Sequence, residues 1–338
     1  MKISVVIPCH NEEKSIRACV ESCLTQTRPF DQILVINDGS TDKSGEILAS
    51  FGDKIDVLTI EKATGNKSRA QEKGLPLVTG DIFVATDGDT KLNTGFAAAM
   101  EKAFQDEKVV AVSGIVKSLP YNWLTAVRAF EYIVAHYFHK LAQSYLDYIF
   151  VISGAAGAFR TKTFREYLPF EHDTLTEDLD ITYKLHKFGF KIAYTLDAIS
   201  YTQDPISLPE YKNQMRRWYG GGWQSLKKHF RVIISSPNRA LEMSLIYIEG
   251  ILFSIFLFVL PLINLRLAIL FLIGNIAFNM LFAIAASIKE KRYDILYVPF
   301  IYPFMIYVNA FVFLEQGIKE VVFNKKNLVW FHPERVNI

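Results

Sequence analysis

The sequence is poor in cysteine, and this shortage excludes a protein stabilised by a disulfide framework. Its 338 residues contain three cysteines, Cys9, Cys19 and Cys23, and an odd, sparse set does not make a disulfide framework. Cys19 and Cys23 stand four residues apart near His10, which leaves a metal site open. A helix that buries two small apolar residues on one face explains the same spacing. We therefore expect free thiols in a reducing compartment.

The net charge of the chain is also small. The formal net charge is +2, from 37 lysines and arginines against 35 aspartates and glutamates. The first half of the chain has no basic stripe with interleaved aromatic residues, which a nucleic-acid-binding surface would require, so we exclude nucleic acid as a partner. The opening segment MKISVVIP has one lysine and a short apolar stretch before Pro8. Because this is not the pattern of a secretory leader, we expect the N-terminal domain in the cytoplasm.

Charged residues are rare in one long part of the chain, residues 236–318. Two segments there, 241–260 and 264–286, come close to the about 20 apolar residues that cross a bilayer. A third segment, 295–317, is aromatic and contains two prolines, so we expect either a kinked span or a re-entrant segment. The sequence therefore predicts a multi-pass protein of the cell membrane with a C-terminal α-helical transmembrane domain.

The remaining residues divide around that domain. Residues 1–235 carry most of the charge and predict a globular domain, and within it the aromatic-rich segment 121–150 predicts either an interfacial helix or a helix packed over the domain. Lysines and arginines follow the second predicted span, and the tail 319–338 is also rich in them. Basic segments favour the cytoplasmic side, whereas three crossings would separate these two, so we expect a cytoplasmic tail and leave the number of crossings open.

Short β-branched runs alternate with helical patterns in the first 120 residues. The runs are ISVVI, ILVI, IDVLTI, IFVA and VVAVSGIV, at 3–7, 33–36, 55–60, 82–85 and 109–116. The helical patterns between them open with capping residues such as Asn66. This alternation predicts an α/β, Rossmann-like domain with a mainly parallel sheet covered on both faces. In such a sheet, ligands bind beyond the carboxyl ends of the strands.

Acidic side chains follow two of these predicted strands. Asp38 ends the run ILVIND, Asp87 ends IFVATD, and Asp89 comes after Gly88. Because the carboxyl ends of parallel strands meet at one edge, these carboxylates should face the same crevice. Two aspartates one residue apart can hold a hard divalent cation that also binds phosphate oxygens. Acidic pairs also close strand-to-loop turns through solvation and capping alone.

Seven motifs follow one another between residues 5 and 218. They are VVIPCHNEE (5–13), VINDGSTD (35–42), GNKSRAQEKGL (65–75), ATDGDT (85–90), SGAAGAFR (153–160), TEDLDITYKLHKFGFKIAY (176–194) and QMRRW (214–218). Together they resemble the family 2 glycosyltransferases with the GT-A nucleotide-sugar fold, particularly membrane synthases similar to hyaluronan, cellulose and poly-N-acetylglucosamine synthases. The resemblance covers roughly residues 1–235, and the tail NLVWFHPERV also resembles the end of such synthases.

The resemblance implies roles for residues at the strand ends. Asp89 looks like the ligand of a Mg²⁺ or Mn²⁺ ion. The family's usual D-D-G has Asn37 in its first position here, which leaves Asp38 as the nucleotide contact. The donor-binding residues that the resemblance implies are Pro8, Glu12, Asp38, Lys67 and Asp87.

The resemblance also implies an acceptor side. Asp178 looks like the general base, a role that is typically worth roughly 10²- to 10⁴-fold in rate. Without the other motifs, the acids around it would indicate only a helix start that suits the helix dipole. The residues expected at the acceptor and diphosphate end are Glu177, Gln214, Arg217 and Trp218. A solvated basic helix turn would explain QMRRW as well, and the glycines 220–222 predict a flexible turn or a helix end.

These inferences predict an inverting, metal-dependent hexosyltransferase. We expect a UDP-sugar donor and a glycan acceptor, with membrane lipid and either a second copy or another membrane protein as partners. Transfer of a single sugar to a lipid carrier or membrane lipid is the alternative, since two or three spans are few for a channel. A non-catalytic sugar-nucleotide sensor is a third hypothesis, and the presence of Asp178 in TED argues against it.

Overall fold

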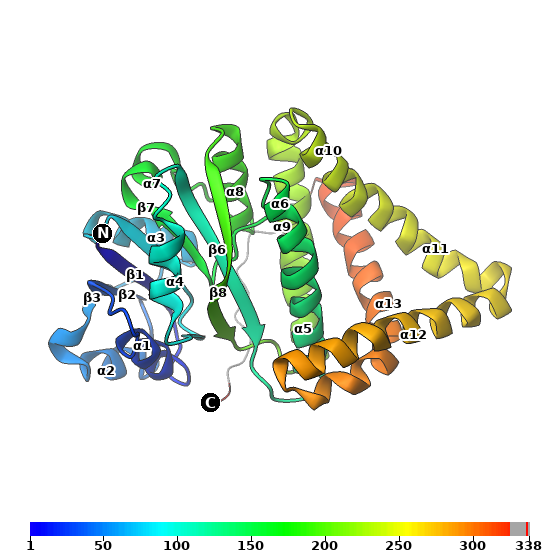
Figure 1. Cartoon of the computed structure of the whole chain (residues 1–338), viewed down its shortest axis with the longest axis horizontal. Coiled ribbons are helices and arrows are strands. Elements are labelled where there is room, and N and C mark those ends of the chain that lie inside the picture. The colour runs from blue at the N-terminus through cyan, green and yellow to red at the C-terminus, as the bar shows by residue number, and fades with distance from the viewer. Residues whose placement is uncertain (325–335, 337–338) are drawn as a thin grey trace. The chain divides into compact units, whose positions relative to one another are not determined.

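The computed structural model describes residues 1–324 and Val336. The fold divides into two compact units, and Figure 1 labels most of the elements of both. The first unit holds Met1–Lys117 and His139–Gln203, and the second holds Ser118–Phe138 and the described residues 204–324. Most of the basic tail 319–338 lies outside the described residues, so its predicted cytoplasmic location stays a prediction.

The first unit is built on a mixed sheet. Over the described residues the sheet has eight strands, in the order β3-β2-β1-β4-β7-β6-β8-β5. The strands are β1 Ile3–Cys9, β2 Gln32–Asp38, β3 Asp56–Ile60, β4 Ile82–Ala85, β5 Thr90–Leu92, β6 Val109–Ser118, β7 Gly157–Arg160 and β8 Lys191–Thr202. All five runs that we predicted as strands are strands, so the α/β prediction is confirmed.

One half of the sheet is parallel, whereas we predicted a sheet that is mainly parallel throughout. β1 pairs in parallel with β2 and β4, and β2 pairs in parallel with β3. β1 is buried along its whole length, as an apolar strand covered on both faces should be. In the other half, β7 runs antiparallel to β4 and β6, and β5 runs antiparallel to β8. The carboxyl ends of β1, β2 and β4 therefore meet at one edge, while the complete sheet is mixed.

Helices connect these strands and complete the first unit. They are α1 Ile16–Leu24, α2 Ser44–Ala49, α3 Lys67–Gly74, α4 Phe96–Ala103, α6 Leu141–Tyr145, α7 Thr161–Tyr167 and α8 Glu177–Lys187. The predicted cap of α3 is present, because the Asn66 side chain accepts a hydrogen bond from the Ser68 N–H. One core cluster contains Phe83, Phe159 and Phe164, whose ring centroids lie 5.0–5.5 Å apart.

The second unit is helical. Its helices are α5 Trp123–Val134, α9 Leu208–Ile234, α10 Pro237–Met243, α11 Gly250–Ile263, α12 Leu265–Glu290 and α13 Val298–Gly317. Within the described residues, three helical segments are long and apolar enough to cross a membrane: Pro237–Ile263, Leu265–Glu290 and Tyr293–Val322. α13 stays helical through Pro303. The number of crossings and the domain boundaries at 235 and 318 stay predictions.

The expectation of a turn or helix end at glycines 220–222 is wrong. α9 runs helically from Leu208 to Ile234, and its one residue with non-helical backbone angles is His229. A Cβ at Gly222 would lie 2.8 Å from the hydroxyl oxygen of Tyr247. Gly222 therefore permits close packing inside the second unit. Close packing, rather than a turn or a helix end, explains a glycine at this position in a helix.

We predict that a methyl group at Gly39 destabilises the first unit. Gly39 follows β2 with a φ of +62°, and its Cβ would lie 2.4 Å from the Ala63 nitrogen. Gly52 is the matched control, because its φ is +56° but nothing lies within 4 Å of its Cβ position. Gly52→Ala should cost roughly 1 kcal/mol for the left-handed backbone. Gly39→Ala should cost roughly 1–3 kcal/mol more, from overpacking.

Thermal unfolding of the two purified variants, compared with the unchanged protein, measures this difference. Equal losses of stability in Gly39→Ala and Gly52→Ala would show that the loop after β2 yields to the added methyl group.

Candidate functional site

The strand ends of β1 and β4 lie against each other at the carboxyl edge of the sheet. Glu12, in the loop after β1, is only 7% exposed, and its carboxylate accepts a hydrogen bond from the Ser15 hydroxyl at 2.6 Å. A Cβ at Gly88 would lie 3.3 Å from both the Glu12 Cγ and the Pro8 carbonyl oxygen. Gly88 therefore lets the loop after β4 approach Pro8 and Glu12, so the structure brings these predicted donor-binding residues together.

Asp38 is fixed at the end of β2 by the loop before α3. Its carboxylate accepts hydrogen bonds from the Thr64 N–H at 2.8 Å and from the Thr64 hydroxyl at 2.7 Å. The His10 Nδ1 lies 2.6 Å from the Asp38 carbonyl oxygen, so that nitrogen donates. A carboxylate has about four lone-pair sites, and two hydrogen bonds leave acceptor capacity for a ligand.

Lys67 stands at the centre of the site. Its ammonium lies 2.5 Å from a carboxylate oxygen of Asp87 and 3.3 Å from one of Glu177. Burial alone would lower the pKa of Lys67, but the negative charges of Asp87, Glu177 and Asp178 raise it well above its usual range. The side chain therefore stays charged, and it joins the loop after β4 to the start of α8.

Asp178 occupies the first turn of α8. One of its carboxylate oxygens accepts a hydrogen bond from the Leu179 N–H at 2.8 Å. A Cβ at Gly154 would lie 3.2 Å from the Lys67 Nζ and 3.7 Å from the Asp178 Oδ2. Gly154 thus lies beside both charged groups, and the structure brings Lys67, Asp178 and their neighbours together. The predicted acidic helix start is present too, so the helix dipole favours these carboxylates.

Asp89 suits a divalent cation through its chemistry. The residue is 9% exposed, and one carboxylate oxygen accepts a hydrogen bond from the Thr90 hydroxyl at 3.0 Å. Mg²⁺ and Mn²⁺ prefer oxygen ligands, and Mg²⁺ is usually held by one or two carboxylates together with water and substrate phosphates. A buried carboxylate beyond the carboxyl ends of the strands fits that requirement. The nearby Asp87 carboxylate already binds the Lys67 ammonium.

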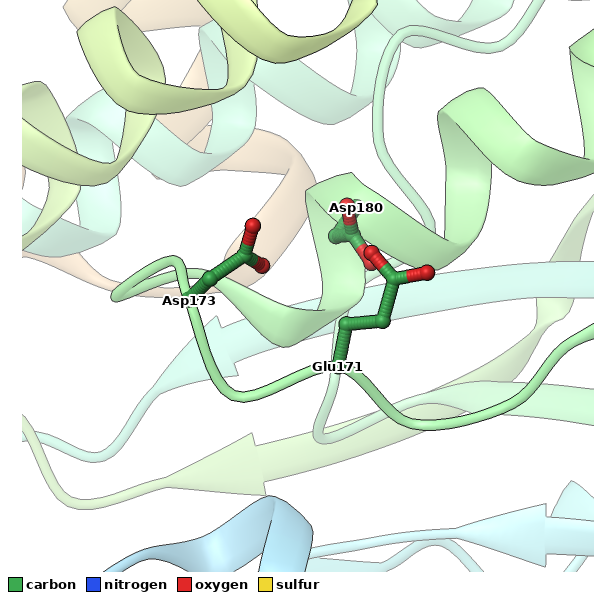
Figure 2. Close-up of side chains that lie close together, drawn as sticks. All are labelled: Glu171, Asp173 and Asp180. Atoms are coloured by element: carbon green, nitrogen blue, oxygen red, sulfur yellow. The ribbon is translucent and has the colours of Figure 1, made fainter.

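A separate carboxylate cluster lies at the start of α8. Among the described residues it is the one group of three potential metal ligands within reach of one ion, and it consists of Glu171, Asp173 and Asp180. Figure 2 shows Glu171 and Asp173 on the loop before α8 and Asp180 on the helix. The ammonium of Lys184 lies 2.9 Å from Asp180 and 3.3 Å from Glu171. Because a lysine already pairs with two of the three acids, we interpret the cluster as a salt-bridged helix start.

The cysteines are buried free thiols, as expected. The metal site that the spacing of Cys19, Cys23 and His10 left open does not form such a group of ligands within the described residues. Burial and the Glu12 charge raise the pKa of Cys9 to about 12, so this thiol is not a nucleophile at neutral pH.

The remaining predicted residues lie on α9 in the second unit. The guanidinium carbon of Arg128 lies 4.8 Å from the Trp218 ring centroid and 4.5 Å from the Tyr132 ring centroid. The side-chain carbonyl oxygen of Gln214 is buried and has no hydrogen-bond partner in the described part of the chain. Arg216, the neighbour of Arg217, forms an ion pair with Glu315 at 2.9 Å. α9 therefore combines a held indole ring with an amide oxygen that can still accept a hydrogen bond.

Sequence reasoning missed Arg128 as a part of this arrangement. Its side chain is 3% exposed and forms ion pairs with Glu131 and Asp204. The available signal was an isolated basic residue in the aromatic segment 121–150, where a buried cation needs both acidic and aromatic neighbours. Glu131 is close in sequence, but Asp204 and Trp218 are distant, so those two contacts are visible only in the fold.

Comparison with known proteins agrees with the family resemblance of the seven motifs. Residues 4–168 match the sequence profile described as Glycosyl transferase family 2. The poly-beta-1,6-N-acetyl-D-glucosamine synthase of Staphylococcus epidermidis is 26% identical over 242 residues, which are 71% of this chain and 59% of that synthase. The chain thus spans less than two thirds of that relative. The probable glycosyltransferase YdaM of Bacillus subtilis is 25% identical over 369 aligned positions, covering 99% of this chain and 87% of YdaM.

A solved structure has the same fold. The mannosyltransferase PcManGT from Pyrobaculum calidifontis, in complex with GDP-Man and Mn²⁺, superposes with a TM-score of 0.68. The two sequences are 18% identical, and the match covers 96% of this chain and 88% of the mannosyltransferase. At this identity the likeness establishes the fold.

We predict that removing the Lys67 charge destabilises the protein. Lys67→Met leaves the Asp87 and Glu177 carboxylates facing each other without a cation, and breaking a buried ion pair on one side costs roughly 3–5 kcal/mol. The exposed Lys62 is the matched control, since the same substitution there should change stability by less than about 0.5 kcal/mol. Chemical unfolding at neutral pH measures both. Similar values for Lys67→Met and Lys62→Met would contradict the bridging role.

Proposed function

We propose that the chain, whose residues 4–168 match the profile described as Glycosyl transferase family 2, is an inverting, metal-dependent glycosyltransferase of the membrane. One observation carries the proposal. Asp87 and Glu177 pair with Lys67, and Lys67 and Asp178 both lie beside Gly154, so charged groups from three separate segments meet there. Such a group of charges beside strand ends can bind a nucleotide diphosphate and hold a base next to it.

The donor in this proposal is a nucleotide diphosphate sugar. Carboxylates at strand ends accept hydrogen bonds from base N–H groups and ribose hydroxyls, which suits Asp38 and Glu12 beside Pro8. Lys67 supplies positive charge for the diphosphate. We keep a UDP-sugar as the proposed donor on the resemblance to the synthases, and a GDP-sugar is the competitor, since the solved mannosyltransferase is in complex with GDP-Man.

The transfer step requires a base and stabilisation of the leaving group. In the proposed reaction Asp178 takes the proton of the acceptor hydroxyl, whose oxygen bonds to the anomeric carbon as the bond to the diphosphate breaks. Asp178 lies in the first turn of α8, where the helix dipole favours a negative charge. A Mg²⁺ or Mn²⁺ ion would be held by Asp89 and would offset the charge of the departing nucleoside diphosphate. The Mn²⁺ in the mannosyltransferase structure supports a divalent cation here.

The acceptor is proposed to be a glycan, with Gln214, Arg217 and Trp218 at its binding site. An indole stacks on the apolar face of a sugar ring, and a guanidinium binds phosphate in a fork geometry. The names of the staphylococcal relatives favour chain extension. Transfer to a lipid carrier is the second candidate, and the three apolar helices favour it equally, because a membrane helix can present a lipid acceptor to a cytoplasmic domain. A second copy or another membrane protein would complete a channel if the product crosses the membrane.

We predict incorporation of one sugar from a panel of labelled nucleotide sugars. Membranes that contain the protein are incubated with each donor and Mg²⁺ or Mn²⁺, and the product is sized. A long chain indicates a polysaccharide synthase, and a single lipid-linked sugar indicates the second candidate. Asp178→Asn should abolish incorporation while donor binding persists, because the amide cannot accept the proton. Donor binding without transfer by the unchanged protein would favour the sensor hypothesis, and full activity of Asp178→Asn would remove the base.

We predict that Asp89→Ala weakens donor binding only when metal is present. In Mg²⁺ or Mn²⁺ the dissociation constant should rise by at least about tenfold, or roughly 1.4 kcal/mol, because the ion loses its carboxylate ligand. With EDTA the variant and the unchanged protein should bind alike. Asp53→Ala, which removes an exposed carboxylate, is the control for a change in charge alone. Calorimetry measures donor binding by both proteins in each condition. If Asp89→Ala binds the donor as tightly as the unchanged protein both with metal and with EDTA, Asp89 is not a metal ligand.

A further inference from the structure

Lys140 is a buried lysine that the proposed reaction does not yet use. It ends the π-helical segment Ala135–Lys140 and belongs to the first unit. Its ammonium group donates to the Ser153 hydroxyl at 2.7 Å and to the Ser113 hydroxyl at 3.1 Å, and the residue is 6% exposed. Lysines are rarely buried unless a carboxylate pairs with them. In the described part of the chain Lys140 has hydroxyl partners but no ion pair, so its burial needs another explanation.

The segment that Lys140 holds leads directly to the proposed base. The Ile152 N–H donates to the Thr182 hydroxyl at 3.0 Å, and that hydroxyl donates to the Asp178 carbonyl oxygen at 2.6 Å. Ile152 is therefore attached to α8 through Thr182, whose hydroxyl is bonded to the first turn of the helix. On the other side Ser153 is attached to Lys140. The next residue, Gly154, lies beside the Asp178 carboxylate and the Lys67 ammonium.

The charge of Lys140 also reaches Asp178. Burial lowers the pKa of Lys140 to about 7, and the negative charge of Asp178 acts in the opposite direction. Among the described residues Asp178 is the one charged group with a resolved influence on this amine; its other close partners, Ser113 from β6 and Ser153 from the loop before β7, are neutral. A change of charge on Lys140 should therefore alter the protonation equilibrium of Asp178.

We propose that Lys140 is a positioning residue for sugar transfer, which holds residues 152–154 against the first turn of α8 and places a positive charge near Asp178. This inference rests on the proposed function, because it assigns Lys140 to the support of that base. It adds a residue outside the seven motifs. In its protonated form Lys140 favours the carboxylate of Asp178, so it keeps the base ionised at the acidic end of the working range.

The first test is the pH dependence of kcat for sugar transfer. Lys140→Met removes the charge with a side chain of similar length, so protonation of Asp178 becomes easier. The acidic limb of the profile should move to higher pH by about one unit. Lys140→Arg keeps a positive charge, so any activity it retains should keep the acidic limb in place. Lys162→Met makes the same change at an exposed lysine and should reproduce the unchanged profile.

A Lys140→Met profile that superposes on that of the unchanged protein, after scaling, would overturn the electrostatic part of the proposal. A merely structural lysine would lower the amplitude without moving the limb. If the unchanged protein transfers no sugar from any donor, the proposed function fails instead, and the second test then decides on Lys140.

The second test needs no activity. Lysine labelled with ¹³C at the ε carbon is followed by NMR through a pH titration, and the Lys140 resonance is identified by its loss in Lys140→Arg. Its midpoint should lie near neutral pH and should fall in Asp178→Asn, because the variant lacks the negative charge that favours the ammonium form. An unchanged midpoint in Asp178→Asn would show that the two groups are not coupled and would refute the inference, even if Lys140→Met does not fold.

Discussion

The ion pairs of the Lys67 ammonium with Asp87 and Glu177 are the interaction on which the site depends. A buried lysine has to be paired, and two partly buried carboxylates that face each other need a cation, so each group offsets the desolvation of the others. The loop after β4 and the start of α8 are thereby held together, although they are far apart in the sequence. Asp178 takes its place as the neighbour of Glu177 on the same helical turn.

Two lysines near Asp178 differ in their surroundings. Lys67 faces carboxylates and has a raised pKa, whereas Lys140 faces two serine hydroxyls and has a lowered pKa. Desolvation acts on both, and the number of nearby negative charges decides the direction. One lysine is therefore a permanent charge suited to a diphosphate, and the other titrates in the neutral range. In the proposed reaction, the first would serve donor binding and the second would support the base.

The second unit has to accommodate buried polar groups among helices that are long and apolar enough to span a membrane. Arg128 is held between aromatic rings and acidic side chains, and its ion pairs with Glu131 and Asp204 offset its charge. At Gly222 the missing side chain lets α9 approach Tyr247 closely. These contacts make α9, which carries the QMRRW motif, part of the helical unit and fix the Trp218 ring within it.

Local patterns in the amino-acid order were enough to predict the parallel half of the sheet, the Asn66 cap and the three apolar helices. Each of these depends on neighbours in the chain: apolar runs, a capping side chain, or about 20 apolar residues in a row. The order of the motifs also identified the family. The folded chain was needed to establish that β7 pairs in antiparallel fashion, that α9 continues through its glycines, and that Lys184 forms ion pairs with two acids of the cluster. The same holds for the positions of Lys67 and Lys140 near Asp178. These features arise from pairings between distant segments, and a residue's burial and partners cannot be read from its own neighbours in the chain.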